Sequence, residues 1–207
     1  MSSTLTLIPL EQSEDTLTST VCADEKSYIL LYGFCEGRKM IRVNLAQEGA
    51  YACIVGMIFG QRGLCSISTF QHHSASYTTS DLLIKTVLVD SAVFQYDGRI
   101  RIEQNAHGSN AYQRNENISL SPLTRIATRP SLEILANDVC CTHGATIGTF
   151  DDEDYFYLQS RGMIKSEAGR LLVRGFFQNV IRKIPAELMT DYVHTILERQ
   201  LCMIPYE

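Results

Sequence analysis

Two adjacent cysteines and a histidine, Cys140, Cys141 and His143, form the strongest cluster of metal-ligand side chains in the 207-residue sequence. Thiolates and imidazoles are ligands for iron, iron–sulfur clusters and zinc. The stretch offers three ligands at most, and no second Cys/His pair follows with the spacing of a four-ligand structural zinc site. Adjacent residues on a strand point to opposite faces, so the two cysteines cannot both face one ion unless a bulge intervenes. The stretch alone is an incomplete metal site, and the alternative for His143 is a side chain that caps a strand end by hydrogen bonding.

Three other motifs are expected to be structural. His72 and His73 alternate across a strand and lack a partner motif, so they fit a polar stack near a turn. The acidic run at residues 151–154 is explained by an exposed helix N-terminus. The glycine-containing stretch at residues 60–63 lacks the Lys and the Ser or Thr of a P-loop, so any ATP must be bound by another protein.

The elements that position these residues are predominantly strands up to residue 150. Short alternating or apolar runs occur at residues 41–45, 50–59, 64–70, 82–89, 99–103, 118–120 and 132–135. Gly, Asn, Asp and Ser separate them, where chain reversals are favourable. Asp97-Gly98 fits either a two-residue hairpin or a corner of a β-solenoid. No strict repeat emerges, so these patterns leave a solenoid and a β-sandwich both open.

Helical spacing begins after Phe150. The acidic run should cap a short helix through Ser160 that Gly162 closes. A second helix is expected from about Ser166, and Pro185 should end it and open a third. The predicted apolar face of the second helix comprises Ala168, Leu172, Gly175, Phe176, Val180 and Ile184, and that of the third Met189, Val193, Ile196 and Leu201.

Charge and hydropathy exclude some classes of function. The sequence is 45% hydrophobic and 20% charged, which predicts a folded globular protein. Its net charge of −5 and scattered Lys and Arg residues argue against a nucleic-acid partner. The longest apolar run, at residues 52–59, is far shorter than the roughly 20 residues needed to cross a bilayer, so no membrane span is expected.

The first twenty residues contain no Lys or Arg, unlike a secretory or mitochondrial leader. We therefore expect a cytosolic protein. The seven cysteines are an odd number, mostly among apolar neighbours, which predicts buried free thiols and a reducing compartment.

A resemblance to the SufB/SufD family of iron–sulfur cluster scaffolds is carried by DVCCTHGATIG at residues 138–148 and RPSLEI at residues 129–134. Further similarity lies downstream in YFYL at 155–158, SRG at 160–162, LL at 171–172 and GF at 175–176. Upstream similarity, in the same order as in the family, lies in HH at 72–73, TSD at 79–81, GRI at 98–100, AYQ at 111–113 and NEN at 115–117. The resemblance covers roughly residues 39–184.

The resemblance implies a mainly β fold, a right-handed parallel β-helix with a C-terminal α-helical segment. It implies residues 1–38 as a short unassigned segment, residues 39–150 as the β-helix core and residues 151–207 as a helical domain that docks an ABC ATPase, SufC. The B-type paralogue has acidic residues flanking the matching His, whereas Thr142 and Gly144 flank His143, so the chain resembles the D type. Members also have a larger N-terminal helical region than residues 1–38 supply.

The resemblance further implies a non-catalytic, cytoplasmic scaffold that helps to acquire iron and to form or hold a transient iron–sulfur cluster shared with a partner. It assigns His143, with Cys141 beside it, to the cluster site at the interface, while Cys140 is an addition to the pattern. The partner is a SufB-type subunit or a second copy of this chain. Phe156, Arg161 and Phe177 are candidate SufC contacts, Phe177 because it lies off the apolar face of its helix. The alternatives are a β-helix carbohydrate-active enzyme, for which aromatic platforms are few because Trp is absent, and a degenerate paralogue that only completes a dimer.

Overall fold

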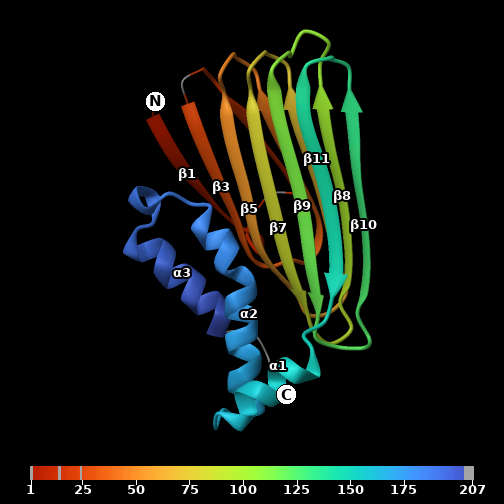
Figure 1. The fold of residues 1–207 in the computed structure, drawn as a ribbon, viewed down its shortest axis with the longest axis vertical. Helices are drawn as coiled ribbons and strands as arrows, with labels where there is room; N and C mark the ends of the chain where they lie inside the picture. Colours follow the sequence, from red (N-terminus) through yellow and green to blue (C-terminus); the bar gives the residue numbers. More distant parts are fainter. Residues whose placement is uncertain (1, 14, 24, 203–207) are drawn as a thin grey trace.

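Eleven parallel strands in two sheets, followed by helices, make up the computed structural model, which describes residues 2–13, 15–23 and 25–202 (Figure 1). The strands are β1 Ser2–Pro9, β2 Thr16–Val21, β3 Glu25–Phe34, β4 Gly37–Leu45, β5 Tyr51–Gly60, β6 Leu64–His73, β7 Thr79–Leu88, β8 Val93–Ile102, β9 Ser109–Ser119, β10 Arg125–Ile134 and β11 Val139–Gly148. The mainly β prediction for residues up to 150 is confirmed.

Successive strands alternate between the two sheets. Sheet A has the order β1-β3-β5-β7-β9-β11 and sheet B the order β10-β8-β6-β4-β2, and every pairing is parallel. This stacking is a β-solenoid, so the β-helix prediction is confirmed and the antiparallel sandwich alternative is wrong. Ser27 pairs with Ala52, 25 residues on, but Asp81 pairs with Tyr112, 31 residues on. The turns differ in length, which explains why the sequence shows no strict period.

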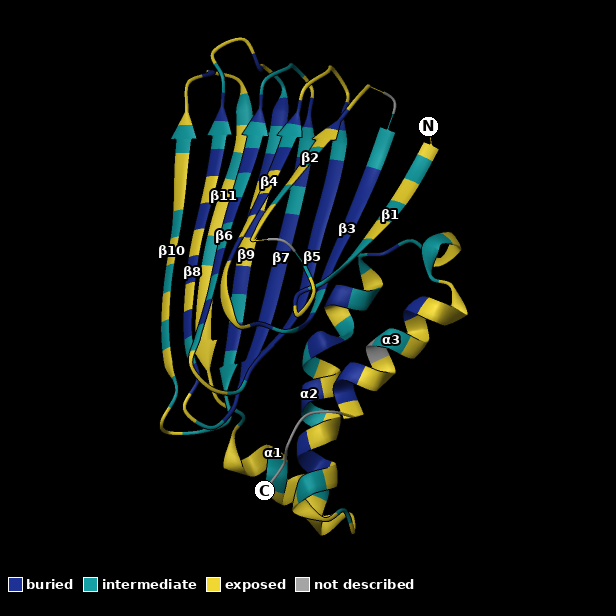
Figure 2. Cartoon of the chain, turned by 180° about the vertical axis from the view of Figure 1, so that it is seen from behind, coloured by how far each residue is buried: buried dark blue, intermediate teal, exposed yellow. Residues whose placement is uncertain are grey.

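Strand patterning follows from what covers each face. β6 alternates between half-buried and buried positions because only its inner face meets the core. β5 is buried at every position after Tyr51, because its inner face joins the core between the sheets and its outer face lies under the helices. β5 is accordingly almost entirely dark blue in Figure 2, and β3 is dark blue along its middle with half-buried residues toward its ends.

Asp97-Gly98 is neither a hairpin nor a corner, because both residues lie within β8. A Cβ atom on Gly98 would collide with the Gln113 side chain and would approach the Tyr96 hydroxyl to 2.6 Å. The glycine therefore makes room for large polar side chains inside the solenoid. The rule that Asp-Gly marks a turn failed here, because the glycine is needed for packing inside a strand and not for a chain reversal.

Strands also occupy the segment before residue 39, to which the sequence analysis assigns no element. β1 and β3 extend sheet A, and β2 extends sheet B. Leu10, Val21, Ile29 and Leu31 contribute buried side chains to the same core as the later turns. β1 and β2 were missed because their Ser- and Thr-rich alternation is less apolar than that of the central strands. β3, in contrast, carries a buried apolar run at residues 28–31 that is typical of a strand.

Helices occur only after Phe150 among the described residues, as expected. They are α1 Asp152–Ser160, α2 Lys165–Arg182, the short 3-10 helix η1 Ala186–Leu188 and α3 Asp191–Cys202. Asp151 occupies the N-cap position of α1 but its side chain makes no capping hydrogen bond. Gly162 follows α1 with a positive φ of 94°, as a closing glycine should. Pro185 opens η1, and the third helix begins later than predicted, at Asp191. None of the helices in the described part of the chain is long and apolar enough to cross a membrane.

The buried face of α2 is rotated by about one residue from the predicted face. Its buried residues are Ala168, Gly169, Val173, Phe177 and Val180. The Phe177 side chain is fully buried, and its ring centroid lies 5.1 Å from that of Phe59 on β5. The prediction that Phe177 is free to contact a partner is therefore wrong. The error arose because Phe176 and Phe177 are adjacent, and spacing alone did not determine which of them faces sheet A.

Charged side chains also fix α2 on sheet A. Lys85 on β7 donates a hydrogen bond of 2.7 Å to the Phe176 carbonyl oxygen and lies 2.8 Å from a Glu116 carboxylate oxygen. Lys183, just after α2, forms an ion pair with Asp81 on β7. Because the Lys85 side chain is almost fully buried, its charge needs these partners. The helical segment is thus anchored by both apolar and ionic contacts.

The cysteines depart from the prediction of buried free thiols. Cys35 and Cys65 are both buried and form a disulfide, and their Cα atoms are 5.3 Å apart. Of the five free cysteines only Cys53 is buried. The prediction relied on sequence neighbours, but β4 and β5 separate Cys35 from Cys65 along the chain, whereas the solenoid stacks the two cysteines side by side.

Candidate functional site

The last strand of each sheet, β10 and β11, leaves part of the solenoid interior uncovered. Register places Leu132 and Ile134 beside buried Ile100 and Ile102, so they point inward, yet they are 36% and 40% exposed. Ile147 on β11 points inward beside buried Asn117 and is 54% exposed. Apolar side chains with the orientation of core residues therefore face solvent at this end, and both strands are sheet edges.

Cys141 and His143 lie on the inward face of β11, at this open end. They are two residues apart on one strand, and β9 pairs them with Ala111 and Gln113, which are both buried. Cys141 packs against a small apolar cluster that includes Ile100 and Ile102. The structure therefore brings the thiol and the imidazole to the same face, as the spacing requires.

His143 is exposed and lies in the middle of β11, so it does not cap a strand end. No side chain or backbone group among the described residues forms a hydrogen bond with its imidazole ring. The ring has no structural partner in this part of the chain. It is therefore available to bind a ligand at the open end.

The Cys141 thiol is half-buried. Burial, followed by the neighbouring Cys140 thiol, raises its pKa above the usual value for cysteine. The thiol is therefore protonated at neutral pH, and a metal ion must displace that proton before the sulfur can coordinate it.

Cys140 lies on the other face of the strand, so no bulge brings the two cysteines together. Its Sγ atom accepts a hydrogen bond of 3.7 Å from the Tyr112 hydroxyl on the outer surface of sheet A. Cys140 cannot join Cys141 and His143 on one ion from this position.

Buried polar side chains continue from His143 into the solenoid, a feature that the sequence analysis missed. Gln113, the neighbour of His143 in the sheet, is 1% exposed and its Oε1 atom accepts a 3.3 Å hydrogen bond from Gln71. Gln113 Nε2 has no partner among the described residues. The available signal was the alternation of Gln113, Asn115 and Asn117 at positions that later prove to face inward.

His72 and His73 have the structural roles that were expected. The buried His73 ring bonds the Thr78 and Ser80 hydroxyls, at 2.8 Å each, and burial lowers its pKa to about 4. His72 faces outward and its Nε2 atom lies 2.9 Å from a Glu103 carboxylate oxygen. The two rings are on opposite sides of β6 and do not form a metal site together.

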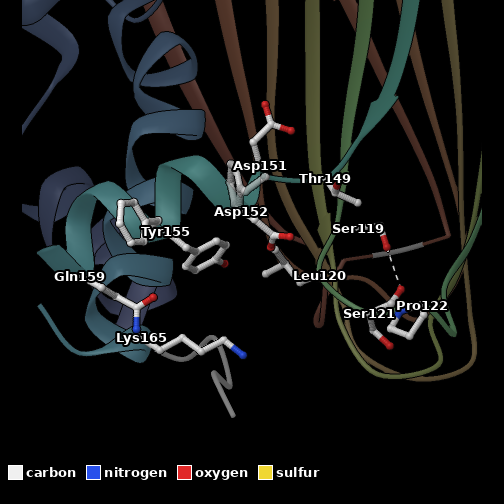
Figure 3. Close-up of a pocket in the computed structure, with 12 residues that line it drawn as sticks. Ser119, Leu120, Ser121, Pro122, Thr149, Asp151, Asp152, Tyr155, Gln159 and Lys165 are labelled. Carbon is white, nitrogen blue, oxygen red and sulfur yellow. Dashed lines mark hydrogen bonds between the residues drawn. The ribbon is translucent and has the colours of Figure 1, made fainter.

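A second candidate surface lies at α1, which buries none of its residues. A hollow of about 820 Å³ separates α1 from the turn after β9. Figure 3 shows Tyr155, Gln159 and Lys165 on one side of it and Ser121 and Pro122 on the other. Phe156 also lines this hollow and is 74% exposed, which is unusual for a phenylalanine.

Arg161 is exposed at the C-terminal end of α1, with its guanidinium group 5.2 Å from the centre of the Tyr157 ring. Of the three predicted partner contacts, Phe156 and Arg161 thus lie together on an exposed helix. Phe177 lies elsewhere, in the core beneath α2.

The donor types at the open end suit iron–sulfur chemistry, but the chain supplies too few of them. Cys141 and His143 provide one sulfur and one nitrogen donor, whereas a cluster usually needs four protein ligands. No group of three or more His, Cys, Asp or Glu side chains within residues 2–13, 15–23 and 25–202 is arranged to hold a metal ion. A cluster at this end therefore requires donors from elsewhere.

Comparison with known proteins gives one family. The family described as "SUF system FeS cluster assembly, SufBD core domain" matches residues 21–176, well over half of the chain. The iron–sulfur cluster assembly protein SufD of Bacillus subtilis is 31% identical over 159 residues, which cover 76% of this chain. SufD of Escherichia coli K12 is 35% identical over 113 residues, 55% of this chain, and a SufBD family protein of Synechocystis is 38% identical over 103 residues, 50% of this chain.

The matched regions are a minor part of these relatives. They cover 36% of the Bacillus protein, 27% of the Escherichia coli protein and 23% of the Synechocystis protein. The chain therefore spans about a quarter to a third of the length of these relatives.

Proposed function

Because this chain belongs to the SufB/SufD family of iron–sulfur cluster assembly proteins, we propose that it is a non-catalytic, SufD-type scaffold subunit acting in the cytosol. Its task is to help acquire iron and to form or hold a nascent cluster at an interface with another family member. The cluster is cargo, built and then passed on. Family membership favours this role over that of a β-helix carbohydrate-active enzyme.

The observation that carries the proposal is the position of Cys141 and His143 on the inward face of edge strand β11. Unpaired backbone groups at the edges of β10 and β11 can pair with another chain. The exposed Leu132, Ile134 and Ile147 side chains would be covered by that chain. Pairing would thus bury these apolar side chains around the Cys141 and His143 donors, and the second chain would supply the missing ligands. A SufB-type subunit or a second copy of this chain would satisfy these requirements.

Anaerobic reconstitution with ferrous iron and sulfide tests the proposal. We expect this chain together with a SufB-type subunit to develop visible cluster absorbance and protein-bound iron and sulfide, because four ligands are then available. The monomeric chain alone should remain nearly iron-free after desalting, because it supplies only two donors. Equal iron content for the chain alone and for the mixture would show that the partner is unnecessary. Size-exclusion chromatography of the same samples distinguishes heterodimers from homodimers.

We further propose that α1 is the docking surface for the ATPase, SufC, since this chain has no P-loop of its own. Two features support α1 in this role. Phe156 is a large apolar side chain that the fold does not bury, and Arg161 adds an exposed cation at the C-terminal end of the same helix. Aromatic and Arg side chains are the commonest energetic anchors of protein interfaces.

Replacing Phe156 by Ala should weaken SufC binding by about 30-fold, the effect of losing an interface anchor worth about 2 kcal/mol. Isothermal titration calorimetry with purified SufC measures the change. The matched control is Tyr192→Ala on α3, which removes a similarly exposed aromatic side chain. Unchanged affinity for Phe156→Ala, or an equal loss for the control, would remove α1 from the interface.

A further inference from the structure

Arginines gather on the outer face of sheet B, although the sequence predicts scattered basic residues. Strand alternation directs outward Arg38, Arg42, Arg99, Arg101, Arg125 and Arg129. Only two acidic side chains, Asp97 and Glu133, point outward from the strands of this sheet. The face therefore carries excess positive charge in a chain whose net charge is −5.

Most of this charge is not neutralised within the described part of the chain. Arg101 is paired, with Glu103 at 2.8 Å and Glu133 at 3.3 Å. Arg42, Arg99, Arg125 and Arg129 make no ion pair with any residue that the structure describes. Like charges on neighbouring strands repel one another, so a bound anionic group would stabilise this arrangement.

The Phe70 ring lies between Arg42 and Arg99, two of the arginines that make no ion pair with a described residue. Register places Arg42, Phe70 and Arg99 side by side on β4, β6 and β8. The Arg42 guanidinium lies 5.1 Å from the centre of the Phe70 ring. These residues, with Met40, Ser68, Thr69 and Asp97, line a groove of about 410 Å³.

The groove is open to solvent. The helices pack on β3, β5 and β7 of sheet A, and in Figure 2, where the molecule is seen from behind, none of them crosses β4, β6 or β8. The outer face of sheet B is therefore accessible to a binding partner.

We propose that the outer face of sheet B binds an acidic protein segment in which carboxylates flank an apolar side chain. The carboxylates would be held by Arg42 and Arg99, since guanidinium groups bind carboxylates in bidentate fashion. The apolar side chain would lie on Phe70 and Met40. The groove lies on β4, β6 and β8, whereas the proposed interface with another family member uses the edges of β10 and β11 and the proposed SufC surface is α1. Binding in the groove can therefore be measured on the chain alone, without either assembly contact.

Nucleic acid fits this face less well than a protein segment does. A single-strand binding surface stacks successive bases on several aromatic side chains, whereas the outward positions of β4, β6, β8 and β10 carry only Phe70 and the His72 ring, which is stacked beside it. Asp97 would also lie against the phosphates. A peptide can bind the arginines through only a few carboxylates, so it tolerates the nearby Asp97 side chain.

Fluorescence anisotropy of the full chain tests the proposal with two labelled probes, a twelve-residue peptide of alternating Glu and Leu and a twelve-nucleotide single-stranded DNA. We expect the peptide to bind more tightly than the DNA, with affinity falling as salt rises. Arg42→Glu/Arg99→Glu should weaken peptide binding at least about tenfold, because two attractive contacts become repulsive. The control Arg170→Glu/Arg182→Glu makes the same charge change on exposed positions of α2 and should bind as the wild type does.

Three results would overturn the proposal. They are no peptide binding by the wild-type chain, an equal loss of affinity in the control, and tighter binding of the DNA than of the peptide. If the charge-reversed variant does not fold, Arg42→Gln/Arg99→Gln removes both charges without adding repulsion. That variant should also lose peptide affinity, and wild-type affinity would reject the site.

Discussion

Replacing His143 by Ala should abolish cluster build-up on the complex with a SufB-type subunit while leaving the fold and the complex intact. The imidazole is exposed and has no hydrogen-bond partner among the described residues. Its loss should therefore change the free energy of unfolding by no more than about 0.5 kcal/mol. One side chain at the rim of a large interface also contributes little to affinity. Loss of a donor, in contrast, leaves a cluster short of its ligands.

The decisive measurement compares iron, sulfide and visible absorbance of wild-type and His143→Ala complexes at equal amounts of assembled complex. Thr142→Ala is the matched control, because Thr142 is the neighbouring residue on the opposite face of β11. His143→Cys keeps a soft donor at the position and should restore part of the bound iron. Wild-type cluster content in His143→Ala would remove His143 from the mechanism and favour a paralogue that only completes a dimer.

The placement of Cys141 and His143 on one face was predictable from the sequence because it depends only on strand alternation. Separation of Cys140 from them follows from the same rule. The exposure of His143 was not predictable, because it depends on β11 being the edge strand of its sheet. Family resemblance supplied the parallel solenoid, which no periodic spacing in the chain reveals, since the separation of paired residues varies from 23 positions for β1 and β3 to 32 for β8 and β10.

Features that depend on contacts distant in sequence escaped prediction. The arginines of sheet B come from strands separated by whole turns of the solenoid, so they look scattered along the chain. Cys35 and Cys65 likewise meet only because the turns stack. Gln113 looks like a surface residue in sequence, but the solenoid turns it inward against Gly98. Local sequence patterns predicted the strands and helices. The arginine-rich face, the disulfide and the burial of Gln113 depend instead on how the strands stack side by side.

Replacing Phe177 by Ala should lower the free energy of unfolding by about 3–5 kcal/mol, the usual cost of emptying a buried phenylalanine site. The ring is fully buried under α2 and packs on Phe59 of sheet A. For a chain of this length the loss corresponds to a fall of roughly 10 °C in Tm. Circular dichroism at 222 nm during thermal unfolding measures it. Phe156→Ala removes the same side chain from an exposed position and should leave Tm within about 2 °C of the wild type.

The same pair of variants separates a contact residue from a residue that positions the helices. α1 contacts α2, and Phe177 helps to fix α2 on sheet A, so loosening α2 should also disturb the presentation of α1 to SufC. Phe177→Ala should therefore weaken SufC binding only as its Tm is approached, whereas Phe156→Ala should weaken it at every temperature. Binding measured at 10 °C and just below the Tm of the variant distinguishes the two effects. Strong loss for Phe177→Ala at 10 °C, with an intact helical signal, would mean that its ring contacts SufC directly despite its burial in the free chain.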